Sequence, residues 1–555
     1  MPESDRKSFN LATIQEALAA AVPDRECIVH RDRRATWRAF NTRTRRLANF
    51  LLGRGLGCRR ERDTLANWES GQDHLGVYLY NCPEYLEAML GAFKARVAPF
   101  NVNYRYVEEE LVYLLDNAEA TALVYHARFA PTLGKILSRL PRLCTLLQVA
   151  DESGCALLPG AIDYEAALAE SSSARPAVTW SPDDLYILYT GGTTGMPKGV
   201  LWRQEDIFFG ALGGHPPGGA RVTSVEALVE VAKHGSVRVL PAPPFMHGAA
   251  HWAAFNALHQ GGAVVIQSTP EMLVAADVWE TVRRERVNFM LIVGDAFGRP
   301  LLDELERRDD EFPDLRFIAS GGAILTPTLK EGFLAKLPHI LMVDGFGASE
   351  TGGQGQQLTA AGQKAAAGSF RMNEETLVLR ADLTGPLAPG AAEPGWLARV
   401  GNVPLGYYRD PEKTAETFPV IGGVRYAVPG DHAMVAGDGA ITVLGRGSVS
   451  INTGGEKVYP EEVELVLKSH PEVYDAVVVG TPHERWGEQV NAIVQLRRGA
   501  TTAAEDLSAF AAGKVARYKL PKTIIFVDEV VRSPSGKADY RWARARALEA
   551  PGLSA

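Results

Sequence analysis

Features that this 555-residue sequence lacks exclude several classes of protein. It has no stretch near the ~18 uninterrupted apolar residues of a membrane-spanning helix, and the segment from Met1 to Lys7 lacks the apolar core of a signal peptide. Its five cysteines are odd in number and form no Cys-x-x-Cys pair, which disfavours a disulfide framework and a zinc site. We therefore expect a cytoplasmic protein with reduced thiols and no transmembrane segment.

Charge and missing motifs exclude further functions. The net charge of −8 gives no reason to expect nucleic acid as a partner. The sequence contains no Walker loop, and the pair Gly345-x-Gly347 lacks the third glycine of a dinucleotide-binding fingerprint. It has neither a Gly-x-Ser-x-Gly nucleophile elbow nor a recognisable Cys–His pair. A P-loop NTPase, a Rossmann oxidoreductase and an enzyme with a serine or cysteine nucleophile are therefore disfavoured.

The most informative stretch that is present runs from Tyr189 to Val200. A strand-like apolar run ends here and is followed by small or positively charged residues, namely Thr190, Gly191, Gly192, Thr193, Thr194, Gly195 and Lys198. Glycines let backbone N–H groups approach anionic oxygens, threonine hydroxyls add donors, and a lysine adds positive charge. The stretch predicts a loop that binds a polyphosphate, although a solvated turn has the same composition.

Predicted strands and helices alternate through most of the chain. The predicted helices include 11–21, 37–52, 83–94, 107–117, 203–212, 249–259, 271–286 and 327–337, and the predicted strands include 75–80, 237–242, 263–267, 289–293, 315–319 and 340–343. Short strands without polar alternation indicate parallel sheets that are covered on both faces. We predict an α/β fold with a large N-terminal domain of doubly wound, mostly parallel sheets and, from about Gly355, a small β-barrel-like region. A small mobile α+β domain follows, with the boundary near Arg446–Ser450 (domains 1–447 and 448–555).

Two more motifs follow predicted strands, at the edge where open α/β sheets bind ligands. Pro244–Gly248 places His247 at the start of a helix, and His251 lies four residues further on, but no third metal ligand accompanies the pair. Asp344–Thr351 contains Glu350, which could hold Mg²⁺ on a phosphate or could serve only as a helix N-terminal acid.

Taken together, these motifs resemble the adenylate-forming acyl-CoA synthetases, a superfamily that also includes non-ribosomal adenylation domains and luciferases. Eight motifs stand in family order over nearly the whole chain: Thr190–Val200, Pro244–Gly248, Asp344–Gly352, Gly406–Asp410, Tyr426–Asp431, Gly445–Arg446, Gly454–Glu464 and Pro534–Lys537. Within the superfamily, the run from Gly445 to Glu464 and the ending from Ser533 to Trp542 look most similar to bacterial fatty-acyl and steroid-side-chain CoA ligases.

The resemblance implies an AMP-forming acid–thiol ligase that uses ATP, Mg²⁺, coenzyme A and a small-molecule carboxylic acid. A carboxylate would attack the α-phosphorus of ATP to give acyl-AMP and pyrophosphate, and the CoA thiol would then displace AMP. The implied catalytic residues are Lys537, Glu350 (also the Mg²⁺ ligand) and His247, and the implied hinge between the domains is Ser448. The implied nucleotide site comprises Thr190, Gly191, Gly192, Thr193, Thr194, Gly195 and Lys198 at the phosphates, Gly321, Gly322, Ala323 and Phe346 around the adenine, and Asp431 and Arg446 at the ribose. Asp344, Gly347 and Ser349 are also implied to bind the nucleotide.

The sequence departs from the family pattern in places. Phe346 stands where tyrosine is usual, Arg96 occupies a glycine position, and Ser448-Val449 replaces the usual hinge pair. Residues 59–74 are an insertion that we expect to form a surface loop. The acyl group would lie among 208–212, 245–252 and 293–297, although core packing explains these apolar residues equally well.

Other functions stay open at this point. An adenylation enzyme could pass its acyl group to a carrier protein, but Leu212–Pro216, which resembles a phosphopantetheine motif, has Pro216 where serine is required. A luciferase-like oxygenase would share the adenylation motifs. A non-catalytic adenylate-binding paralogue is disfavoured because Lys198, Glu350, Asp431, Arg446 and Lys537 are all present. A homodimer is a possible assembly.

Overall fold

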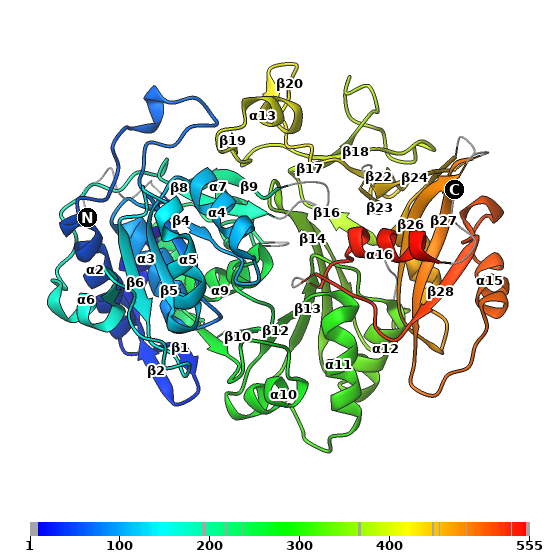
Figure 1. Ribbon diagram of the computed structural model, residues 1–555, viewed down its shortest axis with the longest axis horizontal. Coiled ribbons are helices and arrows are strands. Elements are labelled where there is room, and N and C mark those ends of the chain that lie inside the picture. The colour runs from blue at the N-terminus through cyan, green and yellow to red at the C-terminus, as the bar shows by residue number, and fades with distance from the viewer. Residues whose placement is uncertain are drawn as a thin grey trace.

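The computed structural model describes residues 9–190, 196–216, 219–235, 237–364, 368–446, 449–453, 456–483, 486–533 and 536–550. Within these ranges the strands form sheets of 13, 8, 5 and 2 strands. Figure 1 shows the N-terminal elements on the left and the C-terminal elements, in orange and red, on the right. In the part of the chain that the structure describes, no helix is both long enough and apolar enough to cross a membrane.

The 8-stranded sheet carries the glycine-rich stretch near one edge. Its order is β19-β9-β8-β4-β3-β5-β6-β7, and the strands from β8 to β7 run parallel. The strands are β3 (His74–Tyr78), β4 (Ala98–Asn101), β5 (Ala120–His126), β6 (Thr145–Val149), β7 (Ile162–Asp163), β8 (Leu185–Thr190), β9 (Lys198–Arg203) and β19 (Gly406–Tyr407). Every residue of β3 and β6 is buried, which confirms the prediction of a sheet covered on both faces.

The 13-stranded sheet combines a parallel half and an antiparallel half, in the order β17-β18-β22-β23-β16-β15-β14-β13-β12-β10-β11-β1-β2. Its strands are β1 (Glu26–His30), β2 (Arg33–Thr36), β10 (Arg238–Pro241), β11 (Ala263–Ile266), β12 (Phe289–Ile292), β13 (Phe317–Gly321), β14 (Leu341–Ala348), β15 (Gly352–Thr359), β16 (Ser369–Met372), β17 (Thr376–Leu379), β18 (Gly395–Arg399), β22 (Asp431–Val435) and β23 (Ile441–Arg446). The strands from β14 to β1 are parallel. The predicted barrel-like region is the antiparallel half, and in the described residues it extends the sheet without closing on itself.

The helices cover these sheets. They are α1 (Leu11–Ala21), α2 (Trp37–Gly53), α3 (Pro83–Lys94), α4 (Glu108–Asn117), α5 (Ala130–Ile136), α6 (Tyr164–Glu170), α7 (Gln204–Ala211), α8 (Val225–His234), α9 (Gly248–His259), α10 (Ala275–Arg284), α11 (Gly294–Glu306), α12 (Pro327–Lys336), α13 (Pro411–Thr417), α14 (Pro460–Lys468), α15 (Ala504–Ala512) and α16 (Tyr540–Glu549). The predicted helices 11–21 and 83–94 are confirmed to the residue. In α3, Pro83 occupies the first turn, where its missing N–H costs no helical hydrogen bond.

Two helix predictions differ from the structure. The helix predicted from Glu271 begins only at Ala275, because residues 270–272 form a turn and Asp277 accepts a hydrogen bond from the backbone N–H of Thr269 at 2.7 Å. Helix α8 was not predicted, although Ser224 is a good N-cap and its Oγ accepts from Ala227 N at 3.2 Å. The segment before the β10 strand is therefore helical in part.

The C-terminal residues have a hydrophobic core of their own. Strands β24 (Ile451–Thr453), β25 (Glu456–Val458), β26 (Val473–His483), β27 (Gly487–Leu496) and β28 (Thr523–Val527) form the 5-stranded sheet, and β20 (Val420–Ile421) pairs with β21 (Val424–Arg425) elsewhere. Two clusters of buried apolar side chains draw only on residues 451–547. This agrees with a small C-terminal domain, and its exact boundary stays a prediction because Ser448 lies outside the described residues.

The insertion at 59–74 is anchored to the body of the large domain. Arg96 has a φ of +56°, which explains why glycine would be favoured at its position. Its guanidinium pairs with Asp184 at 2.9 Å and with Glu61 of the insertion at 2.8 Å. The backbone N–H of Arg409 also donates to Trp68 O at 2.9 Å. The arginine and the insertion therefore form one contact, which accounts for both departures from the family pattern.

Candidate active site

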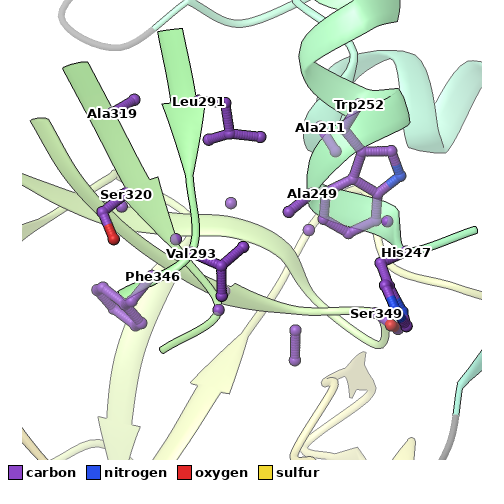
Figure 2. A pocket seen from close by; sticks show the side chains of 18 of the residues that line it. Ala211, His247, Ala249, Trp252, Leu291, Val293, Ala319, Ser320, Phe346 and Ser349 are labelled. Atoms are coloured by element: carbon purple, nitrogen blue, oxygen red, sulfur yellow. The ribbon is translucent and has the colours of Figure 1, made fainter. Parts of the chain in front are cut away.

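A large cavity lies at the carboxyl ends of the parallel strands β12, β13 and β14. It has a volume of about 1730 Å³. Leu291 and Ala319 line it from the strands, Trp252 from α9, and Lys537 from the C-terminal domain. Figure 2 shows the indole of Trp252 and the side chain of Ala249 on one side and Leu291, Val293 and Ala319 on the other. The cavity therefore occupies the place where open α/β sheets bind ligands, as predicted from the sequence.

The structure brings part of the predicted adenine site to this cavity. Gly321, Gly322, Phe346, Gly347 and Ser349 all line it, and Ala323 lies just behind it beside Gly294. The ring of Phe346 packs against Phe370 with 4.6 Å between centroids. One side of the aromatic ring is thus supported by the protein, and the cavity side is available to a planar ligand.

The glycine-rich stretch connects two antiparallel strands. Thr190 at the end of β8 pairs with Lys198 at the start of β9, and Thr190, Met196 and Pro197 line the cavity. The predicted phosphate ligands Gly191, Gly192, Thr193, Thr194 and Gly195 lie outside the described residues. The ammonium of Lys198 forms an ion pair with Asp410 and lies 5.8 Å from the centroid of the Tyr407 ring. Lys198 is therefore held by a carboxylate beside the cavity and is not one of the residues that line it.

Glu350 is buried behind the cavity wall. Its side chain follows β14, is 6% exposed, and accepts a hydrogen bond from the Tyr407 hydroxyl to Oε1 at 2.8 Å. Carboxylate oxygens are the ligands that Mg²⁺ prefers, and this metal is commonly held by one protein carboxylate together with substrate phosphates. No cluster of three or more His, Cys, Asp or Glu side chains suited to a metal occurs in the described ranges. Glu350 therefore suits a metal ion that is coordinated by one carboxylate and by substrate phosphates, rather than one coordinated by several protein side chains.

The carboxylate of Asp344 is engaged by a buried lysine. Its carboxylate forms a buried ion pair with Lys330, whose ammonium also donates to Gln357 Oε1 at 3.1 Å. Burial raises the pKa of Asp344, and the Lys330 charge opposes that shift. The pair joins Asp344 of β14 to Lys330 of α12, and neither residue lines the cavity. It holds β14 in place, whereas a contact with the nucleotide stays a prediction.

Asp431 and Arg446 are brought together by the sheet. They are directly opposite each other on the antiparallel strands β22 and β23. They are 15 residues apart in the chain, and the strand pairing makes them neighbours. Asp438 and Ala440, which lie between them in the chain, line the cavity. Their predicted contact with the ribose stays a prediction.

His247 stands at the N-terminus of α9 and lines the cavity. Its buried Nε2 has no hydrogen-bond partner in the described residues. Burial, and then the positive charge of Lys537, lowers the pKa of His247 to about 3. A neutral imidazole with an unoccupied buried nitrogen can hydrogen-bond a ligand in the cavity. His251, by contrast, bonds Phe245 O through Nδ1 at 2.6 Å and the Tyr186 hydroxyl through Nε2, so the two histidines do not form a metal pair.

Lys537 reaches the cavity from the C-terminal domain. Its Cε lies 3.8 Å from the position that a Cβ on Gly322 would occupy, and Gly322 has a φ of +86°, which only glycine adopts without strain. The neighbouring Gly536 also has a positive φ, +76°, and approaches Val293 at the start of α11. A Cβ at Gly536 would lie only 3.2–3.3 Å from Val293 and Ala296, so a side chain there would crowd the contact between the lysine loop and α11.

A buried arginine supports the lysine loop. Arg532 forms two hydrogen bonds of 2.6 Å with the carboxylate of Asp475 and donates to Gly536 O at 3.2 Å. The backbone N–H of Ser533 donates to Lys537 O at 2.8 Å and closes the loop. Burial lowers the pKa of Arg532, but the hydrogen bonds and the negative charge of Asp475 outweigh this effect and hold the pKa above its usual range. We expect Arg532 to fix the position of the lysine, a role that the sequence did not reveal.

Asn101 is another site residue that the sequence did not reveal. Its side-chain amide donates to Tyr189 O at 2.8 Å and to Met246 O at 2.7 Å, and it accepts from Tyr189 N at 2.8 Å. Asn101 lines the cavity at the end of β4. It ties the strand that leads into the glycine-rich stretch to the segment that carries His247. No strand was predicted at Ala98–Asn101, so nothing in the sequence pattern singled out Asn101.

The fold and the site define a class of protein: a two-part adenylate-forming enzyme whose small C-terminal part contributes a lysine to a cavity in the large part. Solved structures share this fold. ATP-bound MatB from Rhodopseudomonas palustris matches with a TM-score of 0.79 and 23% identity, covering 98% of this chain and 99% of the other. The anthranilate CoA ligase AuaEII in complex with anthranoyl-AMP matches with a TM-score of 0.81 and 22% identity, covering 99% of each chain.

Sequence comparisons identify the family. The AMP-binding enzyme model matches residues 15–401, and the AMP-binding enzyme C-terminal domain model matches residues 462–537. The chain is 52% identical over 543 residues to the medium-chain acyl-CoA ligase Mig of Mycobacterium avium, covering 98% of each. It is 42% identical over 553 residues to the 3-oxocholest-4-en-26-oate–CoA ligase of Rhodococcus rhodochrous, covering 97% of this chain and 96% of the relative.

This chain therefore belongs to the AMP-binding enzyme family. The predicted class, an ATP-dependent acyl-CoA synthetase, is confirmed. The roles of individual site residues stay predictions.

Proposed function

We propose that this protein joins a hydrophobic carboxylic acid of medium or greater length to coenzyme A, with ATP converted to AMP and pyrophosphate. The observation that carries the proposal is the position of Lys537, which reaches across from the C-terminal domain to Gly322 in a cavity that His247 and Phe346 also line. A carboxylate and a phosphate are both anions, so bringing them together requires a positive charge at the point of reaction.

In the first half-reaction, a carboxylate oxygen of the acid forms a bond to the α-phosphorus, and the bond from that phosphorus to the bridging oxygen of pyrophosphate breaks. Lys537 is placed to neutralise the oxygens that gain charge in this step. The neutral imidazole of His247 offers a hydrogen bond on the side of α9. Phe346 and the backbone at Gly321 and Gly322 form the surface for the adenine.

In the second half-reaction, the thiol sulfur of coenzyme A forms a bond to the acyl carbon, the bond to AMP breaks, and the thiol proton is released. AMP is a good leaving group in a mixed anhydride, so the protein needs no nucleophile of its own. Since Lys537 fills the cavity edge in the present arrangement, we propose that the C-terminal domain moves between the two steps, with a hinge at Ser448.

Glu350 is the proposed ligand of Mg²⁺. Only one of its carboxylate oxygens is engaged, by Tyr407, in the described part of the chain. The metal would neutralise phosphate charge when it is bound. Thr190 and the following glycines would hold the phosphates, and Lys198 would have to exchange its contact with Asp410 for one with a phosphate.

The walls of the cavity between α9 and β12 support a hydrophobic acid. Ala249, Leu291 and Val293 present apolar side chains there, and the lining continues to Ala211 and Gly213 beyond α7. Apolar walls of this kind suit a hydrophobic acyl group. The relatives named medium-chain acyl-CoA ligase and 3-oxocholest-4-en-26-oate–CoA ligase point in the same direction.

The proposal is tested with a panel of short, medium, long, aryl and steroid-side-chain acids, assayed separately for pyrophosphate release and for acyl-CoA formation. We expect both products with the hydrophobic acids. Pyrophosphate without thioester would favour a carrier protein as the acyl acceptor. If no acid of the panel leads to pyrophosphate release, the proposed enzymatic function is wrong and a non-catalytic adenylate-binding protein is favoured.

The role of the lysine is tested with Lys537→Ala. We expect pyrophosphate release to fall by at least ~100-fold, as when one charge-stabilising donor is removed from an active site. Thioester formation from supplied acyl-AMP should change little, because that step does not need the ammonium. Lys514→Ala, which removes an exposed lysine of the same domain, is the matched control. A Lys537→Ala protein that adenylates at the parental rate would contradict the proposed role.

A further inference from the structure

A chain of hydrogen bonds runs through the core to the indole of Trp252. The indole Nε1 donates to the Tyr186 hydroxyl at 2.9 Å, the hydroxyl bonds His251 Nε2, and His251 Nδ1 bonds Phe245 O at 2.6 Å. Tyr186 and His251 are buried, at 0% and 1% exposure. The chain connects β8, α9 and the segment before α9, and it ends at a residue that lines the cavity.

The direction of each bond follows from the two ends. A carbonyl only accepts, so His251 must carry its proton on Nδ1, and its Nε2 must accept. The Tyr186 hydroxyl therefore donates to His251, which leaves its oxygen to accept from the indole N–H. Burial lowers the pKa of His251 to about 4, so the ring stays neutral, as this arrangement requires. The hydrogen bonds along this chain can therefore all form only when each one points from Trp252 to Tyr186, from Tyr186 to His251, and from His251 to Phe245 O.

The indole packs tightly against the N-terminus of α9. A Cβ on Gly248 would lie 3.3 Å from Trp252 Cε2 and Cζ2, so the ring covers this glycine closely. In Figure 2 the ring stands near His247 and faces the side chains of Leu291 and Val293 across the cavity. An acid whose carboxylate lies near His247 and Lys537 therefore shares this cavity with the indole.

We propose that Trp252 is a specificity-determining residue of this enzyme, and that Tyr186 and His251 are positioning residues that hold its indole as a fixed wall of the acyl part of the cavity. A tryptophan without a partner for its N–H could turn about its side-chain bonds and make room. When the Tyr186 hydroxyl holds the indole, the indole limits the width of the cavity next to the reacting carboxylate. This inference rests on the proposed function, since it concerns the acid that the enzyme accepts.

The test compares three variants with the parent on octanoate, palmitate and a steroid-side-chain carboxylate. Trp252→Ala removes the wall, Trp252→Phe keeps an aromatic ring but removes the N–H, and Tyr186→Phe keeps the tryptophan but removes its anchor. For each acid, kcat/KM is measured by pyrophosphate release at saturating ATP. Thermal unfolding checks that each protein is folded, and the KM for ATP reports on the nucleotide site.

For Trp252→Ala we expect the ratio of kcat/KM for the steroid acid to that for octanoate to rise at least ~10-fold, since one methylene group in a pocket is already worth about that factor. Trp252→Phe and Tyr186→Phe should shift the ratio in the same direction by less, through KM of the acid and not KM of ATP. A uniform fall in kcat for all acids, with an unchanged ratio, would show that the residues serve stability only and would overturn the proposal.

Direct binding of the same acids, measured by calorimetry, separates this inference from the proposed function. If the parent binds the acids but releases no pyrophosphate, the proposed function fails, while a changed ratio of dissociation constants in Trp252→Ala still supports the fixed wall. Equal ratios in parent and variants would overturn the fixed wall even if the enzyme is active. Trp252→Phe keeps the test valid should Trp252→Ala not fold.

Discussion

Whether a predicted site residue can contact a ligand depends on the hydrogen bonds and ion pairs that its side chain already forms. Lys198 and Asp344 both match family motifs, yet Lys198 pairs with Asp410 and Asp344 pairs with Lys330. His247, by contrast, has a buried ring nitrogen without a partner in the described residues and faces the cavity. The residue type indicates which chemistry a side chain can support, and its contacts show whether its polar atoms are available to a ligand.

At this scale we predict that Asn101 is needed to hold the site together. Asn101→Ala leaves the buried N–H and C=O of Tyr189 and the C=O of Met246 without their partner. Each unsatisfied buried group costs about 1–3 kcal/mol, so the three groups together predict a loss of roughly 3–9 kcal/mol in the free energy of unfolding. Urea unfolding measures this loss, and adenylation should fall with it.

Asn101→Asp refines the same test. The carboxylate can still accept from Tyr189 N, but it cannot donate to either carbonyl. We expect it to be no more stable than Asn101→Ala. A fully stable alanine variant would show that water replaces the amide without loss.

At the scale of elements, α14 meets β23 through an unusual carboxyl group. Glu461 begins α14, its Oε2 is buried, and a Cβ on Gly445 would lie 2.4 Å from that oxygen. Burial, and then the charge of Glu464, raises the pKa of Glu461 from 4.5 to about 8. The carboxyl group of Glu461 is therefore mostly neutral at pH 7, where α14 contacts β23.

This shift predicts a pH dependence of stability. A folded-state pKa above the unfolded one gives stability that is fully present below pH 4.5 and is lost as the pH rises to about 8. Glu461→Gln removes this loss, so its melting temperature should exceed that of the parent by a margin that widens over this range and then stays constant. Scanning calorimetry at several pH values measures the margin. Glu505→Gln, on the exposed face of α15, is the control and should show no such trend.

At the scale of the whole molecule, the two domains are joined by a buried ion pair. Asp295 at the start of α11 lies 3.3 Å from Lys468 at the end of α14, and their side chains are 3% and 4% exposed. Arg299 of the same helix lies over the ring of Tyr474 in β26 at 5.1 Å. These contacts hold the C-terminal domain in the orientation that brings Lys537 to the cavity.

We predict that Lys468→Met weakens this orientation. Removing one partner of a buried pair costs a few kcal/mol, so pyrophosphate release should fall by roughly tenfold or more. Thioester formation from supplied acyl-AMP should stay the same or become faster, because it does not require this orientation. Lys233→Met, an exposed lysine on α8, is the control. Equal losses in both half-reactions would argue against a role in domain orientation.

Much of the fold was predictable because it is encoded locally. Helices such as α3 begin at a proline and end where the apolar period stops, and buried strands appear as short apolar runs. The misplaced start of α10 reflects a side chain, Asp277, that bonds back to Thr269 before the helix. The barrel-like region was foreseen as short strands, but its joining to the large sheet depends on pairing between β15 and β16 that no local pattern reveals.

The sequence by itself determined the class of this protein, because each motif is a continuous run whose residue types suit one task and the order of the runs is distinctive. The tertiary structure alone decided which residues meet: Lys537 with Gly322, Asp431 with Arg446, and Tyr186 with Trp252. Such pairs lie from 15 to more than 200 residues apart in the chain. Their contacts depend on how sheets and domains pack, so local sequence carries no direct sign of them.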